Sequence, residues 1–176
     1  GAYRNATREG FRIDYRNPMS QGTRAHQVAA YVVFDAPLVM LCDSPTRYMA
    51  DEACTRFIAS LPVVFDTTRV LAGEIGEYIV TARKRQDCWY VGGLTGWTPR
   101  TLDVDLSLLD PGREYTATLL ADDGRSAAEP ARYVLSTQRV TSATRLQIPV
   151  APGGGFALKI EPADNCLLYT SPSPRD

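Results

Sequence analysis

The sequence predicts an α+β chain in which a helix–strand–helix segment is followed by an antiparallel β-sandwich. Residues 17–45 combine a capped amphipathic helix with one short, continuous apolar run. A second amphipathic helix pattern follows this run. From Glu74 onward the hydrophobic period changes from that of a helix to the alternation typical of strands. A change of class this sharp indicates that the first segment belongs to a larger α/β structure.

The first helix is expected to begin after Ser20 or Thr23, either of which can cap it, and to run to about Phe34. Its apolar positions follow the i, i+3, i+4, i+7 spacing of one buried face. They are Ala25, Val28, Ala29, Val32 and Val33. Pro37 is expected to end the helix.

Residues 38–42 read LVMLC and lie between Pro37 and the turn sequence Asp43-Ser44-Pro45. A short apolar run of this kind is typical of a strand that is buried on both faces, as in a parallel sheet. A second helix is expected after Asp51, a plausible cap, and Pro62 stops it. Residues 63–70 are expected to form an irregular or extended connection. The apolar face of the second helix comprises Ala53, Cys54, Phe57, Ile58 and Leu61.

The remaining chain predicts about seven short strands with turn signals every ~8–12 residues, which is the pattern of an antiparallel sandwich. One face of each strand is apolar, so two sheets can close a core. Gly153-Gly154-Gly155 is interpreted as a tight hairpin turn between the last two strands. The strands are expected around 78–82, 89–91, 102–106, 115–119, 133–135, 146–150 and 156–160.

Three regions are therefore expected. Residues 1–72 are too few to close an α/β sheet, because a single strand leaves both of its edges unpaired. Residues 73–162 form the sandwich. Residues 163–176 are expected to be a non-native tail, because CLLYTSPSPRD resembles, residue for residue, the translation of a sequencing-library adapter; the alternative is a Ser/Pro linker.

Bulk composition excludes several functions. A net charge of −1 gives no basic footprint for nucleic acid and no polybasic membrane patch. No apolar run approaches the ~20 residues that a membrane helix needs. The four cysteines and the single histidine match no zinc pattern. Cys42 and Cys54 are interpreted as small buried hydrophobic residues, with a disulfide between them as the alternative.

Three side chains are candidates for a functional role. Asp43 follows the predicted buried strand, where a carboxylate lines the site of many barrels, although it equally suits a cap for the next turn or helix. Trp97 lies in a Gly/Pro loop and suits sugar stacking; the alternative is that it covers the seam between the two regions, with Trp89 in the core. His26 is expected to bond a neighbouring element rather than to act as an acid–base catalyst.

Five separated blocks resemble the C-terminal part of glycoside hydrolase family 97. They are NPMSQGTRAHQ, YVVFDAPLVMLCDSPTRY, GEYIVTARK, WYVGGLTGWTPR and APGGGFALKI. The resemblance implies an enzyme with an N-terminal sandwich, a (β/α)8 catalytic barrel and a C-terminal sandwich linked to oligomerisation. Residues 1–72 would then be the last helix–strand–helix of the barrel.

The same resemblance implies a calcium-dependent α-glucosidase or α-galactosidase, mostly periplasmic in bacteria, that acts on oligosaccharides with paired carboxylates. None of those carboxylates matches a residue of this chain, so no catalytic residue and no metal ligand is carried over. Asp43 and Ser44 would sit at the rim of the active site. The alternative function is a non-catalytic sandwich that binds carbohydrate or forms homo-oligomers.

Overall fold

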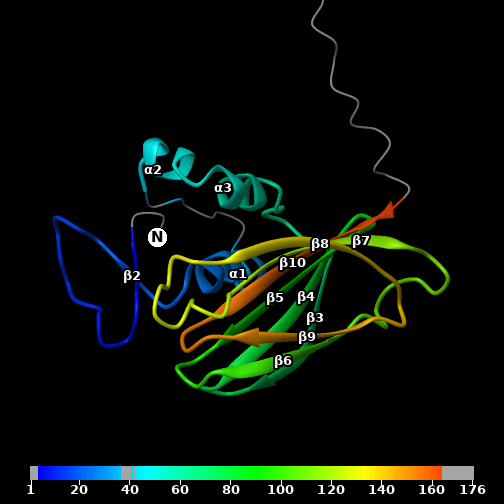
Figure 1. Ribbon diagram of the computed structural model, residues 1–176. Helices are drawn as coiled ribbons and strands as arrows, with labels where there is room; N and C mark the ends of the chain where they lie inside the picture. Colours follow the sequence, from blue (N-terminus) through cyan, green and yellow to red (C-terminus); the bar gives the residue numbers. More distant parts are fainter. Residues whose placement is uncertain (1–3, 37–40, 42, 164–176) are drawn as a thin grey trace, which may run out of the picture.

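The computed structural model describes residues 4–36, 41 and 43–163 of the chain. Its centre is a six-stranded sheet in which every neighbouring pair of strands is antiparallel (Figure 1). The strand order places β10, the last strand in the described part of the chain, in the interior of the sheet. In that order the strands are β3 (Thr67–Glu74), β4 (Tyr78–Arg85), β5 (Cys88–Thr95), β10 (Gly155–Pro162), β7 (Tyr115–Ala121) and β8 (Val134–Val140).

A second, two-stranded sheet covers one face of the large sheet. It consists of β6 (Arg100–Asp105) and β9 (Arg145–Val150), which pair antiparallel. Their apolar side chains are buried in one core cluster with side chains of the large sheet. Members of this cluster include Leu102, Val104, Ile148 and Val150 from the small sheet and Val80, Val91 and Leu158 from the large one. The predicted antiparallel sandwich is therefore confirmed.

The opposite face of the large sheet is covered by helix α1 (Arg24–Val33), as Figure 1 shows. The Thr23 side chain caps the helix by accepting the backbone N–H of His26 at 3.1 Å. This confirms the predicted helix and one of its two alternative caps. Four of the five positions expected on its inner face are buried: Ala25, Val28, Ala29 and Val32. Three of them, Ala25, Val28 and Val32, share a core cluster with Tyr90, Leu120 and Ala157 of the sheet.

Gly92 on β5 allows α1 to lie very close to the sheet. A Cβ atom at this position would lie 3.0 Å from the Ala29 carbonyl oxygen and 2.9 Å from a methyl carbon of Val33. Contacts this short force the neighbour to move. The helix is thus packed on the backbone of the sandwich, and the sheet is apolar on both faces.

Two further helices precede the sheet. Helix α3 (Glu52–Ala59) was expected, and its predicted cap, Asp51, accepts the backbone N–H of Cys54 at 3.4 Å. Cys54 and Phe57 are buried as predicted, whereas Ala53 is exposed. Helix α2 (Pro45–Met49) was not predicted. It buries no side chain, so it leaves no hydrophobic period in the sequence.

The predicted strand at 38–42 lies almost wholly outside the described residues, as does Cys42. Leu41, its described member, belongs to no strand and is half exposed.

Near the start of the chain, a two-residue strand β1 (Asn5–Ala6) pairs in parallel with β2 (Ser20–Gln21). No long helix of the described part is apolar enough to cross a membrane.

Two details differ from the sequence analysis. The connection expected at residues 63–70 gives way to strand β3 from Thr67, and this strand pairs with β4. The turn at Gly153–Gly155 joins β9 to β10, but the two strands lie in different sheets, so the expected hairpin is wrong. The chain passes there from the small sheet to the centre of the large one.

Candidate functional site

The turn between β9 and β10 is hydrogen-bonded to the N-terminal region, which comprises the described residues before β3. The turn therefore joins this region to the sandwich. The Thr23 backbone N–H donates to the Gly153 carbonyl oxygen at 2.9 Å, and His26 Nδ1 lies 3.0 Å from the Gly154 carbonyl oxygen. The carbonyl oxygen can only accept, so Nδ1 carries the proton in this bond. The expectation that His26 bonds a neighbouring element is confirmed.

Asp122 holds the same turn from the other side. Its side chain is buried, and its Oδ2 accepts the backbone N–H groups of Ala151 and Gly155 at 2.9 and 3.0 Å. A Cβ atom at Gly154 would lie 2.0 Å from this oxygen, so only glycine fits there. Burial raises the pKa of Asp122 above its usual value, although hydrogen bonds from Thr23, Ala151 and Gly155 oppose that shift.

Trp97 lies on this turn. A Cβ atom at Gly153 would lie 2.6 Å from Cζ3 of the indole, so the ring packs directly on the glycine backbone. Gly153 has φ of +62°, a conformation that favours glycine. Trp97 therefore covers the seam where the N-terminal region meets the sandwich, while Trp89 is buried in the sandwich core. Both placements agree with the alternative interpretation, in which Trp97 covers the seam and Trp89 lies in the core.

Trp97 also lines a cavity of about 250 Å³ at this seam. The N-terminal region contributes Thr7, Arg8 and Glu9 to its wall, and the loop between β7 and β8 contributes Ser126 and Pro130. An aromatic ring beside charged and hydroxyl groups is the kind of lining that binds a small polar ligand.

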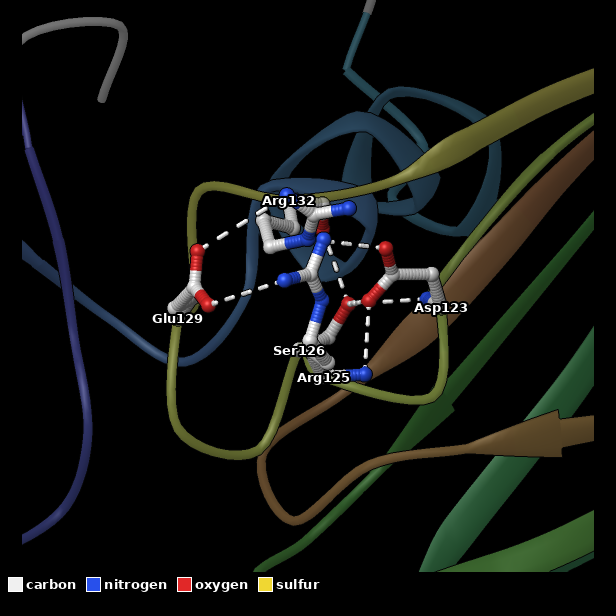
Figure 2. A network of polar contacts seen from close by, with 5 residues as sticks. All are labelled: Asp123, Arg125, Ser126, Glu129 and Arg132. Carbon is white, nitrogen blue, oxygen red and sulfur yellow. Dashed lines mark hydrogen bonds and ion pairs between the residues drawn. The ribbon is translucent and has the colours of Figure 1, made fainter.

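The loop between β7 and β8 is held in shape by the polar network in Figure 2. Asp123 accepts the Arg125 backbone N–H at 2.7 Å and the Arg132 Nε–H at 2.9 Å. The first of these bonds is the main reason that the pKa of Asp123 lies below its usual value. The fully buried Ser126 donates to the Arg132 carbonyl oxygen at 2.9 Å. Glu129 adds ion pairs to Arg125 and Arg132. This wall of the cavity is thus a loop that its own hydrogen bonds and ion pairs hold in shape.

Asp43 and Ser44 lie at the start of α2. Ser44 is the N-cap residue of this helix, and its carbonyl oxygen accepts the backbone N–H of Arg47 at 3.0 Å. Asp43 directly precedes it and is half-buried. The structure does not bring either residue to the cavity beside Trp97, so the rim role of these two residues stays a prediction.

A smaller cavity, of about 110 Å³, lies between α1 and the pair α2–α3, with Asp51 in its wall. Asp51 Oδ2 lies 2.5 Å from Arg24 Nη1, and the Tyr133 hydroxyl donates to Asp51 Oδ1 at 2.6 Å. Burial, and then the charge of Asp51, raises the pKa of the neighbouring Cys54 thiol to about 11. Cys54 is thus a buried free thiol and a poor nucleophile.

These hydrogen bonds and ion pairs fix the positions of α1, the β9–β10 turn and the loop between β7 and β8 relative to one another. Among the described residues, no group of three or more His, Cys, Asp or Glu side chains is arranged to hold a metal ion.

The comparisons with known proteins decide the family. Residues 64–161, more than half of the chain, match the model described as "Glycosyl-hydrolase 97 C-terminal, oligomerisation". The chain belongs to glycoside hydrolase family 97. This family-97 chain is 47% identical over 161 residues, 92% of its length, to a retaining alpha-galactosidase from Bacteroides thetaiotaomicron. It is 31% identical over 76% of its length to a probable retaining alpha-galactosidase from Streptomyces bingchenggensis.

Solved structures agree with this assignment. The chain superposes on a family 97 enzyme from Pseudoalteromonas sp. strain K8, in complex with acarbose, with a TM-score of 0.77 and 29% identity. That match covers 80% of this chain and 23% of the enzyme. The family-97 chain likewise spans 24% of the Bacteroides relative and 20% of the Streptomyces relative.

Sequence reasoning missed the two polar hubs of the molecule, Asp122 and Asp51. Asp51 was interpreted only as a helix cap, and Asp122 was given no functional role. Their distant partners leave no local signal, because Tyr133 is 82 residues from Asp51 and Gly155 is 33 residues from Asp122.

Proposed function

We propose that this chain is the C-terminal part of an α-glycoside hydrolase that cleaves terminal α-linked sugars, in the manner of an α-galactosidase or α-glucosidase. One observation carries the proposal. The likeness to the retaining alpha-galactosidase extends over 92% of the chain, and so reaches well beyond the C-terminal module at 64–161. The segment before that module therefore comes from the same kind of enzyme.

In this proposal residues 1–72 contribute the last helix–strand–helix of the (β/α)8 barrel and 73–162 the C-terminal sandwich, and strand β3 (Thr67–Glu74), which pairs with β4, crosses this boundary as an outer strand of the sandwich. Exposed apolar side chains on this segment suit the first part, because a further layer of the barrel would bury them. These side chains, all more than 50% exposed, are Phe34, Met49, Val63 and Val64. A neighbouring layer of the barrel would cover them.

The catalytic carboxylates and the calcium ion would then be held by other parts of the parent enzyme. The parent would act on oligosaccharides in the periplasm or outside a bacterial cell. Assay of this chain alone on a nitrophenyl α-galactoside tests the assignment. We expect no turnover above buffer, and a protein-dependent rate that survives repurification would show that the chemistry lies within these residues.

Asp43 is proposed as a substrate-side residue at the rim of the barrel. The test is Asp43→Ala and Ser44→Ala in the parent enzyme, with Thr46→Ala, which is exposed on α2, as the matched control. A role at the rim predicts a lower kcat/KM for Asp43→Ala at unchanged thermal stability. Unchanged kcat/KM would reduce Asp43 to a turn residue.

The cavity beside Trp97 favours a second candidate function, the binding of a single sugar ring away from the catalytic centre. Its volume of about 250 Å³ lies below that of typical drug-sized pockets, ~300–1,000 Å³, which suits one ring rather than a chain. Calorimetric titration with galactose and glucose tests this. Binding that Trp97→Phe keeps and Trp97→Ala loses would support stacking on the ring. No heat with the unaltered chain would leave Trp97 as a seam residue only.

A further inference from the structure

Strand β8 is an outer strand of the large sheet. Residues 134–140 pair in unbroken register with β7, and no other described strand lies along their second edge. A free edge of this kind presents a row of backbone N–H and C=O groups that can pair with another strand.

The two outer strands of the sheet differ in how well their edges are protected. The register of β3 with β4 is shifted between Val70 and Ala72, and such a bulge disrupts further pairing. β8 has no shift, no proline and no glycine, and its single charged residue is Arg139. Of the protective features that natural sheets use, β8 therefore carries hardly any.

The side chains of β8 leave the edge partly apolar. Six of its seven residues are exposed, and Val134 and Leu135 are 42% and 44% exposed. Leu135, Thr137 and Arg139 pair with Leu120, Thr118 and Thr116 of β7, so these three side chains share the face of the sheet on which α1 packs.

We propose that β8 is the assembly edge of this module, at which a second copy of the chain adds its own β8 antiparallel across a two-fold axis at Thr137. The proposal rests on the proposed function, in which residues 73–162 form the C-terminal module of the enzyme, and on the description of the matching family model, which names oligomerisation. The two large sheets then form one continuous sheet through backbone hydrogen bonds.

The sequence of β8 is self-complementary in this register. Leu135 of one copy faces Arg139 of the other, and Thr137 faces its own equivalent. No two like charges oppose each other, and the aliphatic stem of Arg139 covers Leu135. The two-fold axis repeats the Leu135–Arg139 pair, so a change at Leu135 acts twice.

Charge reversal at one position tests this pairing. Leu135→Lys and Leu135→Glu remove the same apolar side chain, but lysine meets Arg139 of the other copy as a like charge and glutamate meets it as an opposite charge. Sedimentation equilibrium of the 176-residue chain should give a dimer. We expect the dimer dissociation constant to rise about tenfold or more for Leu135→Lys and to stay within about threefold for Leu135→Glu.

Cross-linking tests the register. Thr137→Cys places two thiols at the axis, and mild oxidation should yield a covalent dimer beyond the background of the unaltered chain. Val70→Cys on β3, the other outer strand, is the matched control and should add none. If the charge introduced at position 135 does not change the dimer dissociation constant, or if the dimer is cross-linked through residue 70 instead, β8 is not the interface. Dimer formation by the module would then hold, but at another surface. A monomer at every concentration would overturn assembly by this module itself.

Discussion

Arg83 offers a sharp test of how the helix is held on the sandwich. This residue of β4 is buried, and its guanidinium reaches the C-terminal end of α1. Nη1 donates to the Phe34 carbonyl oxygen at 3.1 Å, and Nη2 lies 2.6 Å from Asp35 Oδ1. The guanidinium also stacks on the Phe65 ring, with 4.2 Å between Cζ and the ring centroid. The free carbonyl groups at a helix end need such partners.

The two partners of Arg83 should contribute unequally. The Asp35 side chain is 88% exposed, so removing Arg83 leaves no charge buried and unpaired. The cost of Arg83→Ala then comes from the lost charged bond to the helix carbonyl and from lost packing, about 3 kcal/mol in total. Asp35→Ala removes a solvent-screened pair and should cost less than about 1 kcal/mol. Arg83→Lys keeps the charge but loses the planar fork, and should cost about 1–2 kcal/mol.

Urea unfolding followed by circular dichroism gives these free energies of unfolding directly. The expected order of destabilisation is Arg83→Ala, then Arg83→Lys, then Asp35→Ala. Equal losses for Asp35→Ala and Arg83→Ala would refute the reasoning, because the ion pair rather than the helix end would then carry the stability. A loss below about 1 kcal/mol for Arg83→Ala would show that α1 does not need this bond.

Further predictions concern the turn and the helix contact. Asp122→Ala should lower the free energy of unfolding in urea titrations by about 2–4 kcal/mol, because two backbone N–H groups lose their acceptor. In Asp122→Asn the side-chain amide oxygen can still accept both hydrogen bonds. The raised pKa of Asp122 favours the folded state below its usual pKa of 3.8, and this contribution is lost as pH rises through the folded value. As pH rises above 4, the melting temperature of Asp122→Asn should therefore rise relative to that of the unaltered chain. A difference between the two melting temperatures that does not change with pH would contradict this. Gly92→Ala should cost about 1–3 kcal/mol by pushing α1 off the sheet, with Gly124→Ala, which meets no atom within 4 Å, as the near-neutral control.

Elements with a one-sided apolar period could be predicted from the sequence, and the others could not. Helix α1 has four buried side chains at helical spacing, and the strands that face the sandwich core alternate. β3 carries no such signal, because its first four residues are all exposed. α2 was missed for the same reason. A strand that lies on an edge is stabilised by its backbone pairing, which leaves no mark on hydrophobicity.

The candidate sites were predictable only where the interactions are local. The caps Thr23 and Asp51 follow from residue type and position. The glycine turn was located correctly, but a turn sequence does not tell which sheet the next strand joins. The cavity beside Trp97 combines segments that are distant in the sequence, from residues 6–9 to Pro152, so periodicity and spacing cannot predict it.

The interior position of β10 determines the order in which the sheet can be completed. β10 is flanked by β5 and β7, yet among the described strands it is made last during synthesis. Until Pro162 has left the ribosome, β3–β4–β5 and β7–β8 exist as two separate groups of strands whose inner edges are exposed to other chains. The large sheet should therefore be completed only after β10 has emerged, and a nascent chain stalled before Gly155 should depend on chaperones that cover strand edges.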